Sequence, residues 1–205
     1  MRRPDLLGAS RYNVRSMRTA LILALLASST LFAQGPAREQ TLAQVFDGQI
    51  SMIEREVLGL AQKMPAEKYN FAPATGTPPA GTFDGVRTFA LQVRHIASVM
   101  YDFSSQILGE KNPIDMGQNE NGSDKLQTKD QIIAYFKDAI AYSHKAAQSV
   151  TPQNAATKAG TAAFIGLHSY DHYGQMVVYA RLNGVVPGNA PAPGQGKAAP
   201  KGKAK

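Results

Sequence analysis

The chain has 205 residues, and 43% of them are hydrophobic against 18% charged, which is typical of a folded chain of about one domain and excludes a disordered scaffold. There is no cysteine, so disulfides, thiolate nucleophiles and cysteine-based zinc or iron–sulfur sites are excluded. The net charge of +7 does not indicate nucleic-acid binding, because five arginines lie in residues 1–33, four lysines follow residue 196, and the part between is close to neutral.

Residues 1–33 are predicted to be an N-terminal extension and secretory signal peptide, with translation starting at Met17. One basic residue precedes an apolar run from Ala20 to Leu26, and small residues follow up to Ala33. The apolar run is far shorter than the about 20 residues that span a bilayer, which disfavours a membrane anchor. We therefore expect cleavage near Ala33 and a periplasmic or secreted protein with no stable membrane insertion.

The middle of the chain predicts four helices, because its apolar residues recur at steps of three and four. The first segment covers about residues 42–64 and ends at Pro65, and its apolar face is Leu42, Phe46, Ile50, Ile53, Val57, Leu60 and Met64. Residues 65–83 contain four prolines and are predicted to be a long ordered loop, with Tyr69 and Phe71 as anchors onto the bundle.

The second segment is predicted over about residues 84–108. Its apolar face is Val86, Phe89, Val93, Ile96, Met100, Phe103 and Ile107, and its polar strip is Arg87, Arg94, Ser98 and Ser105. Residues 109–127 are loop by composition, and we interpret Asn121-Gly122-Ser123 as a turn rather than as a glycosylation site.

The third segment begins at a cap formed by Thr128 with Gln131, and it ends before Thr151-Pro152. His144 lies at the edge of its apolar face and is interpreted as a solvated surface residue. The fourth segment covers about residues 158–183, followed by Gly184 as a terminating glycine. Residues 34–187 are therefore predicted to form an all-α four-helix bundle with long loops after helices 1 and 2. Residues 188–205 are predicted to be a disordered basic tail rich in Pro, Gly, Ala and Lys.

Three histidines stand where apolar residues are expected. His168 and His172 are four residues apart, on a face of the fourth segment that also carries Phe164, Ile165, Gln175, Tyr179 and Leu182. His95 lies on the apolar face of the second segment. Three imidazoles from two helices can bind a divalent metal and leave positions open to water or substrate. On spacing alone, three separate core histidines bonded to backbone or tyrosines explain the pattern equally well.

Longer motifs around these histidines resemble the DinB-like superfamily of four-helix metal-binding proteins. The motifs are Arg94-His95-Ile96-Ala97 and the run from His168 through His172, Gly174 and Gln175 to Arg181, Gly184 and Pro187, while residues 69–73 resemble the loop before the second helix. The resemblance implies an up-down-down-up bundle over residues 34–187 and a homodimer. It also implies His95, His168 and His172 as ligands of a zinc, nickel, iron or manganese ion.

Members of this superfamily include metal-dependent transferases that activate a small thiol and proteins described as hydrolases. The resemblance therefore implies a metal-dependent hydrolase or transferase acting on a small molecule. Predicted export disfavours the thiol transferases, whose thiols are cytosolic. The alternatives are a non-catalytic metal-binding or stress-response module of the cell envelope, and a helical interaction domain whose histidines are core residues.

Several polar residues near the histidines are candidates for supporting roles. Gln175 and Tyr179 share the histidine face, and we take them as candidate catalytic residues that orient a ligand or substrate. Asp171 is expected to face solvent, and Tyr101 and Asp102 to lie within reach of the rim of the site. Arg181 and Asn183 are expected to fix the end of the fourth helix.

Overall fold

The computed structural model describes residues 39–74 and 81–188, and within these ranges the regular secondary structure is entirely helical. The predicted signal peptide and most of the predicted tail lie outside the described residues. The main helical elements, in chain order, are α2 (Leu42–Ile53), a π-helical turn (Glu54–Leu58), α3 (Gly59–Lys63), α4 (Phe89–Leu108), α5 (Lys129–Gln148) and α6 (Ala155–Leu182). The predicted all-α four-helix bundle is confirmed.

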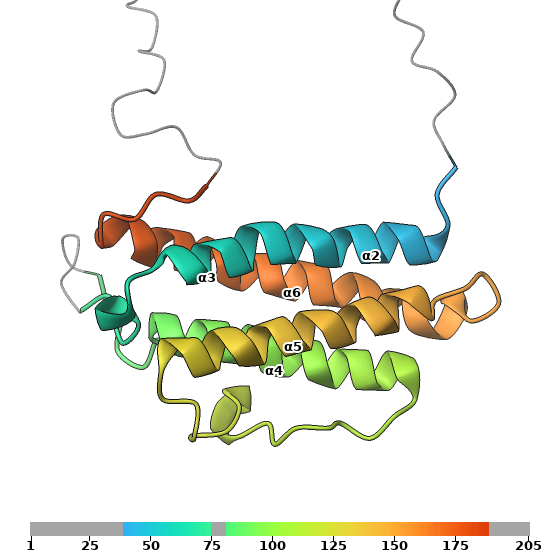
Figure 1. Ribbon diagram of the computed structural model, residues 1–205, viewed down its shortest axis with the longest axis horizontal. Coiled ribbons are helices and arrows are strands. Elements are labelled where there is room, and N and C mark those ends of the chain that lie inside the picture. Colours follow the sequence, from blue (N-terminus) through green and yellow to red (C-terminus); the bar gives the residue numbers. More distant parts are fainter. Residues whose placement is uncertain (1–38, 75–80, 189–205) are drawn as a thin grey trace, which may run out of the picture. The chain divides into compact units, whose positions relative to one another are not determined.

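The direction of each helix follows from its contacts with its neighbours. Along α4 and α5, Ser98 meets Tyr135 and Ser104 meets Ser143, so these two helices are parallel. Helices α4 and α6 are antiparallel, because residues that follow one another along α4 contact residues in reverse order along α6. These contacts are Gln92 with His172, His95 with His168 and Phe103 with Phe164. Lys129 with Met64 and His144 with Asp47 make α2–α3 and α5 antiparallel. Figure 1 shows the same up-down-down-up arrangement.

The first helix of the bundle is one continuous helical segment with a π-helical turn inside it. It begins at Thr41, whose side chain forms a capping box with Gln44. The π-helical turn widens the helix over Glu54–Leu58, which buries both Val57 and Leu58. The helix ends at Met64, whose extended backbone precedes Pro65, as a residue before proline requires.

The other three helices begin and end close to the predicted residues. The second helix begins at Thr88 rather than near Asp84, because the Thr88 side chain accepts a hydrogen bond from the Leu91 amide and Val86 stays exposed. The capping box of Thr128 and Gln131 is confirmed. The fourth helix starts at Ala155, three residues earlier than predicted. Gly184 has a φ of +76°, as expected of a residue that terminates a helix.

The loop before α4 is anchored by the two predicted aromatic residues. Tyr69 is buried, donates a hydrogen bond to the carbonyl of Ala61 and packs edge-on against Phe89. Phe71 packs edge-on against Tyr179 of α6, with 5.9 Å between ring centroids. Residues 75–80 of this loop lie outside the described residues.

The loop from 109 to 127 is packed onto α4 through a buried arginine, which corrects the prediction of a polar strip over Arg94, Ser98 and Ser105. Arg94 is only 6% exposed, and Ser98 and Ser105 are buried as well. The Arg94 guanidinium donates to the backbone carbonyls of Asn121, Gly122 and Ser123. Gly122 has a φ of +68° and lies between two turns, which are closed by the hydrogen bonds from the Asn121 amide to Gln118 and from the Leu126 amide to Ser123.

The fourth histidine, His144, is not the solvated surface residue that we predicted. Its side chain is 25% exposed, and its Nδ1 lies 2.7 Å from the Asp47 carboxylate on α2. Glu54 lies 4.0 Å from its Nε2. The apolar spacing could not reveal this contact, because it depends on the packing of α2 against α5. His144 therefore links two helices away from the other three histidines.

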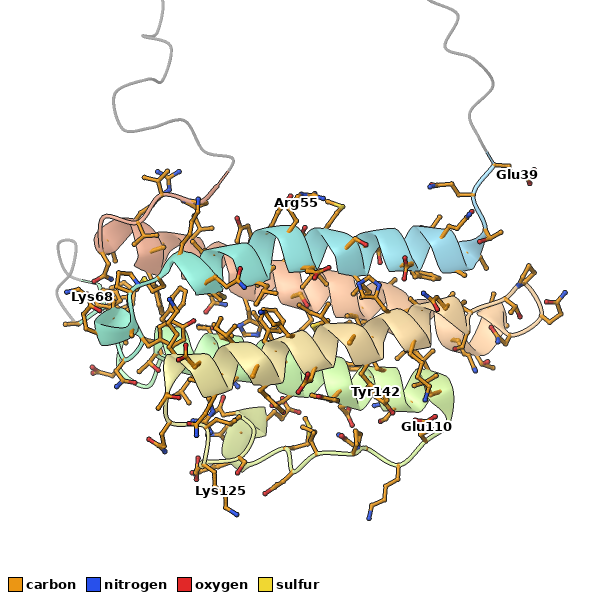
Figure 2. The ribbon with its side chains drawn as sticks, in the orientation of Figure 1. Glu39, Arg55, Lys68, Glu110, Lys125 and Tyr142 are labelled. Atoms are coloured by element: carbon orange, nitrogen blue, oxygen red, sulfur yellow. The ribbon has the colours of Figure 1, made fainter. Side chains whose placement is uncertain are left out.

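The far end of α5 carries a second polar contact with the loop that follows α4. The Tyr142 hydroxyl donates to Glu110, and Lys145 pairs with the same carboxylate at 2.7 Å. Figure 2 shows Tyr142 and Glu110 close together near the end of α4. Among the helices of the described residues, none has the length and hydrophobicity needed to cross a membrane.

Candidate metal centre

His95 on α4 and His168 and His172 on α6 converge in the interior of the bundle. One nitrogen from each ring lies within 4.8 Å of the corresponding nitrogens of the other two. The Nε2 atoms of His95 and His168 are 3.1 Å apart. The convergence follows from the helices, because residues four apart on α6 share a face and antiparallel packing places that face against His95.

Two of the three rings are oriented by hydrogen bonds at Nδ1. His95 Nδ1 donates to the carbonyl oxygen of Glu120 at 3.1 Å, and His172 Nδ1 donates to Gln92 Oε1 at 2.6 Å. Both acceptors lack a proton, so each Nδ1 must carry one and each Nε2 keeps a free lone pair. Gln92 is itself held, because its Nε2 donates to Gln175 Oε1 at 2.9 Å. Such contacts are typical of metal-binding histidines.

The environment keeps these imidazoles neutral at physiological pH. Burial lowers the pKa of His168 to about 4, and the neighbouring His95 adds to the effect. Burial also lowers the pKa of His172 to about 4, with further contributions from His168 and His95. The pKa of His95 is lowered by burial and by the positive charge of Arg87. Neutral imidazoles are the form that binds metal ions.

The three rings fit the requirements of a divalent metal ion. Two nitrogens bound to one ion at about 2.0–2.1 Å each lie roughly 3.0–3.4 Å apart, and the 3.1 Å between His95 and His168 falls in this range. His168 Nδ1 is buried without a hydrogen-bond partner within the described residues. The cluster comprises these three histidines alone in the described ranges 39–74 and 81–188, so an ion would keep positions free for other ligands.

Two cavities adjoin the cluster. A cavity of about 640 Å³, which we call the polar chamber, is lined by Gly85, Val86, Arg87, Leu91, Gln92, Asn119, Glu120, Asn121 and Gln175. A cavity of about 220 Å³, the aromatic chamber, is lined by Val99, Asp102, Phe103, Glu120, Phe164 and His168. Glu120 lines both chambers, and His168 opens into the second. A small molecule in the aromatic chamber therefore meets His168 directly. The polar chamber adjoins the cluster only through Gln92 and Glu120, the residues that hold His172 and His95.

The structure distinguishes the two candidate catalytic residues. Gln175 is exposed and lines the polar chamber, but it reaches the histidines only through Gln92. Tyr179 is buried and packs against Phe71; burial raises its pKa, and a hydrogen bond with Gln92 lowers it in part. We therefore regard Gln175 as a residue that orients Gln92, and Tyr179 as part of the wall between α6 and the loop before α4.

Of the other residues predicted to lie near the site, some line it and others do not. Asp171 is exposed, as predicted. Asp102 lines the aromatic chamber, whereas Tyr101 does not reach it and packs against Tyr135 and Tyr142, where burial raises its pKa to about 12. Asn183 donates to the carbonyl of Tyr179 at the end of α6.

The prediction of the buried face of the fourth helix was wrong for two of its residues. Phe164 and Leu182 are 42% and 46% exposed, and the buried centre of the face is Ile165, Ser169, His172, Met176 and Tyr179.

Gln92, Glu120 and Arg87 are the site residues that sequence reasoning missed. Gln92 had one visible signal, because it interrupts the apolar arc of the second segment one turn before His95. Glu120 acts through its backbone carbonyl, which any residue type supplies, so no side-chain pattern could identify it.

The fold and the site together define the class of protein: a four-helix bundle in which three histidines, from the second and fourth helices, converge. A family model of the DinB superfamily matches residues 49–178, well over half of the chain. The chain belongs to the DinB superfamily, which confirms the resemblance found in the sequence. A comparison with proteins of curated function finds no match.

Proposed function

We propose that the protein binds a divalent metal ion through His95, His168 and His172 and acts as a metal-dependent enzyme on a small molecule. The observation that carries the proposal is the convergence of three neutral imidazoles beside two open cavities. A structural zinc site is normally closed by four protein ligands, whereas three ligands leave room for substrate. Zinc, nickel, iron and manganese all accept imidazole, so the ligand set does not select one of them.

The residues around the site have separate tasks in this proposal. A bound ion would supply Lewis-acid polarisation of a substrate oxygen. The Glu120 carbonyl and Gln92 hold the rings of His95 and His172 and fix their protonated nitrogens away from the centre. Burial of His95 and His172 shields these two rings from water, and the aromatic chamber gives a substrate access to the cluster at His168.

Hydrolysis is the reaction class that we favour over thiol transfer. The predicted signal peptide would place the mature protein outside the cytosol, where cytosolic thiols do not serve as substrates. Hydrolysis needs only water as the second reactant. The predicted export is a separate hypothesis, which N-terminal sequencing of the protein secreted by its host would test through cleavage near Ala33.

Elemental analysis of the protein, purified without a histidine tag, tests the metal site. We expect nearly one equivalent of a transition metal in the native protein and none in the variant with His95, His168 and His172 all replaced by alanine. Equal, negligible metal in both proteins after incubation with each candidate ion would overturn the proposal. Metal-dependent hydrolysis in a panel of esters and amides then tests catalysis, and its absence would favour a non-catalytic metal-binding module.

A further inference from the structure

The two chambers beside the histidines differ in chemistry and share a wall. The polar chamber is lined by one arginine and by the amide side chains of Gln92, Asn119, Asn121 and Gln175. The aromatic chamber is lined by Val99, Phe103 and Phe164 on its apolar side, next to His168, and by the carboxylates of Asp102 and Glu120. Glu120 lines both chambers. A ligand that extended past Glu120 would therefore meet amide groups and Arg87 in one chamber, and two aromatic rings beside His168 in the other.

The wall at Glu120 is held in a fixed position. Asn119 and Glu120 have φ values of 52° and 58°, a left-handed conformation that residues other than glycine seldom adopt. Arg87 stabilises it by donating from Nε to Asn121 Oδ1 at 2.9 Å and from a terminal nitrogen to the Asn119 carbonyl at 3.0 Å. The hydrogen bond from His95 fixes the Glu120 carbonyl. The boundary between the chambers is thus set before any ligand binds.

The polar chamber favours a negatively charged group. Three neutral imidazoles would leave the charge of a divalent ion uncompensated, and Arg87 adds a further positive charge on the same side. Glu120 is the one carboxylate among the chamber's lining residues and offsets the charge of Arg87, so the preference for an anion depends on the charge of the bound ion. Two of the five N–H groups of Arg87 have partners within the described residues, which leaves donors for a carboxylate.

The aromatic chamber has the size and walls for one ring. Phe103 and Phe164 pack with 4.9 Å between centroids, and Phe164 stacks on His168 at 5.8 Å with an interplanar angle of 30°. A wholly apolar cavity of about 150 Å³ holds benzene. This chamber has about 220 Å³, which is room for one ring, and Asp102 and Glu120 line it beside the aromatic side chains. Phe164 is 42% exposed although it is aromatic, so a ligand ring would bury surface that the protein alone leaves in water.

We propose that the substrate is a two-ended small molecule, with a carboxylate or similar anionic group in the polar chamber near Arg87 and an aromatic or comparably sized apolar group against Phe164. The group that links the two ends lies beside the histidines. This inference rests on the proposed metal site, because it takes the histidine cluster as the point where the two ends join. It adds the substrate class, which neither the fold nor the ligand set specifies.

Three related probes test the proposal by binding to the zinc-loaded protein in calorimetry. N-benzoylglycine carries a ring, a central carbonyl and a carboxylate. N-acetylglycine lacks the ring, and N-benzoylglycinamide lacks the carboxylate. We expect N-benzoylglycine to bind at least about tenfold more tightly than either of the others. Equal affinity for all three probes, or no binding of N-benzoylglycine up to about 10 mM, would overturn the proposal.

Two variants locate the ends of the probe. Gln175→Glu keeps an oxygen that accepts from Gln92 and adds a negative charge to the polar chamber. It should therefore weaken N-benzoylglycine about tenfold more than it weakens N-benzoylglycinamide. Phe164→Ala should remove the preference for the ring. Leu167→Ala is its matched control, because Leu167 is 70% exposed and does not line the aromatic chamber. Loss of the ring preference in Leu167→Ala as well would contradict the assignment of the chamber.

Metal content separates this inference from the proposed function. Each variant is analysed for zinc before titration. We expect the native content in all of them, because the three histidines and the hydrogen bonds that hold His95 and His172 are retained. A native protein that holds no metal would overturn the proposed function itself. A native protein that holds zinc and binds the three probes alike would overturn the two-ended substrate and leave the metal site intact.

Discussion

The amide oxygen of Gln92 accepts a hydrogen bond from His172 Nδ1 at 2.6 Å, and the amide nitrogen of the same side chain donates to Gln175. Gln92 is 1% exposed, so no solvent can replace either contact. One buried amide therefore joins α4 to α6 and fixes the ring of a candidate metal ligand. This relationship makes Gln92 the residue through which ring orientation can be tested apart from the ligands.

Gln92→Met should weaken metal binding by about 10- to 100-fold without unfolding the protein. Methionine has a similar volume, so the packing is retained while both hydrogen bonds are lost. A chelator competition titration measures the affinity. Gln106→Met on the same helix is the control, because Gln106 is exposed and bonds only to Asp102 among the described residues. Equal affinities in the two variants would contradict the role of Gln92.

Acidification should destabilise the metal-free protein between about pH 6.5 and pH 4. The pKa values of folded His168 and His172 are lowered to about 4 from the ordinary value of 6.5. In this window the unfolded chain binds protons that the folded chain does not, so stability falls as pH falls, and above the window the two states bind equally.

Urea unfolding at several pH values measures this dependence. The variant with the three histidines replaced by alanine should show a weaker decline over the same window, because its unfolded state has fewer groups to protonate. An identical decline in both proteins would assign the effect to other groups.

Arg94→Met should lower the free energy of unfolding by about 2–4 kcal/mol and also weaken metal binding. Arg94 is buried and donates to three loop carbonyls that would be left without a donor. The same loop supplies the carbonyl of Glu120 to His95. Denaturant unfolding and a chelator titration measure the two effects.

Asp124→Asn is the matched variant for Arg94. The carboxylate lies 3.2 Å from the Arg94 guanidinium, but the Asp124 side chain is 92% exposed. Solvent screens such a pair, so the change should cost less than about 0.5 kcal/mol. A cost as large as that of Arg94→Met would show that the ion pair, and not the backbone contacts, holds the loop.

His144→Ala should leave the metal content unchanged and lower the free energy of unfolding by about 1 kcal/mol. The expected loss comes from the contact with Asp47, which is 35% exposed and therefore partly screened. Elemental analysis beside each single alanine variant of the other histidines measures the contrast. Loss of metal in His144→Ala would mean that the ligand set differs from the cluster described here.

The helices and the three histidines were predictable because both depend on local spacing. Apolar residues at three and four predict helices, and a polar imidazole within such a face is conspicuous at His95, His168 and His172. The caps at Thr128 and Gly184 are equally local signals. The resemblance to the DinB superfamily then supplied the topology, which loop length alone left open.

The supports of the site were not predictable because they arise between segments distant in the sequence. Arg94 is buried only because the loop after α4 folds back over it, and the carbonyl of Glu120 reaches His95 for the same reason. His144 meets Asp47 across 97 positions of sequence. Periodicity assigns residues to a face of one helix, but it does not say which backbone groups another segment brings there.

The up-down-down-up order places the two ends of the bundle sequence at opposite ends of the helices, since Leu42 begins at one end and α6 finishes at the other (Figure 1). Circular permutation is readily tolerated where chain ends are close. In this bundle, a linker that joined the two ends would have to cover the length of a helix. For α4, which has 20 residues, that length is about 30 Å. Partners or surfaces attached through the two ends would therefore be held apart by the bundle, which acts as a spacer between them.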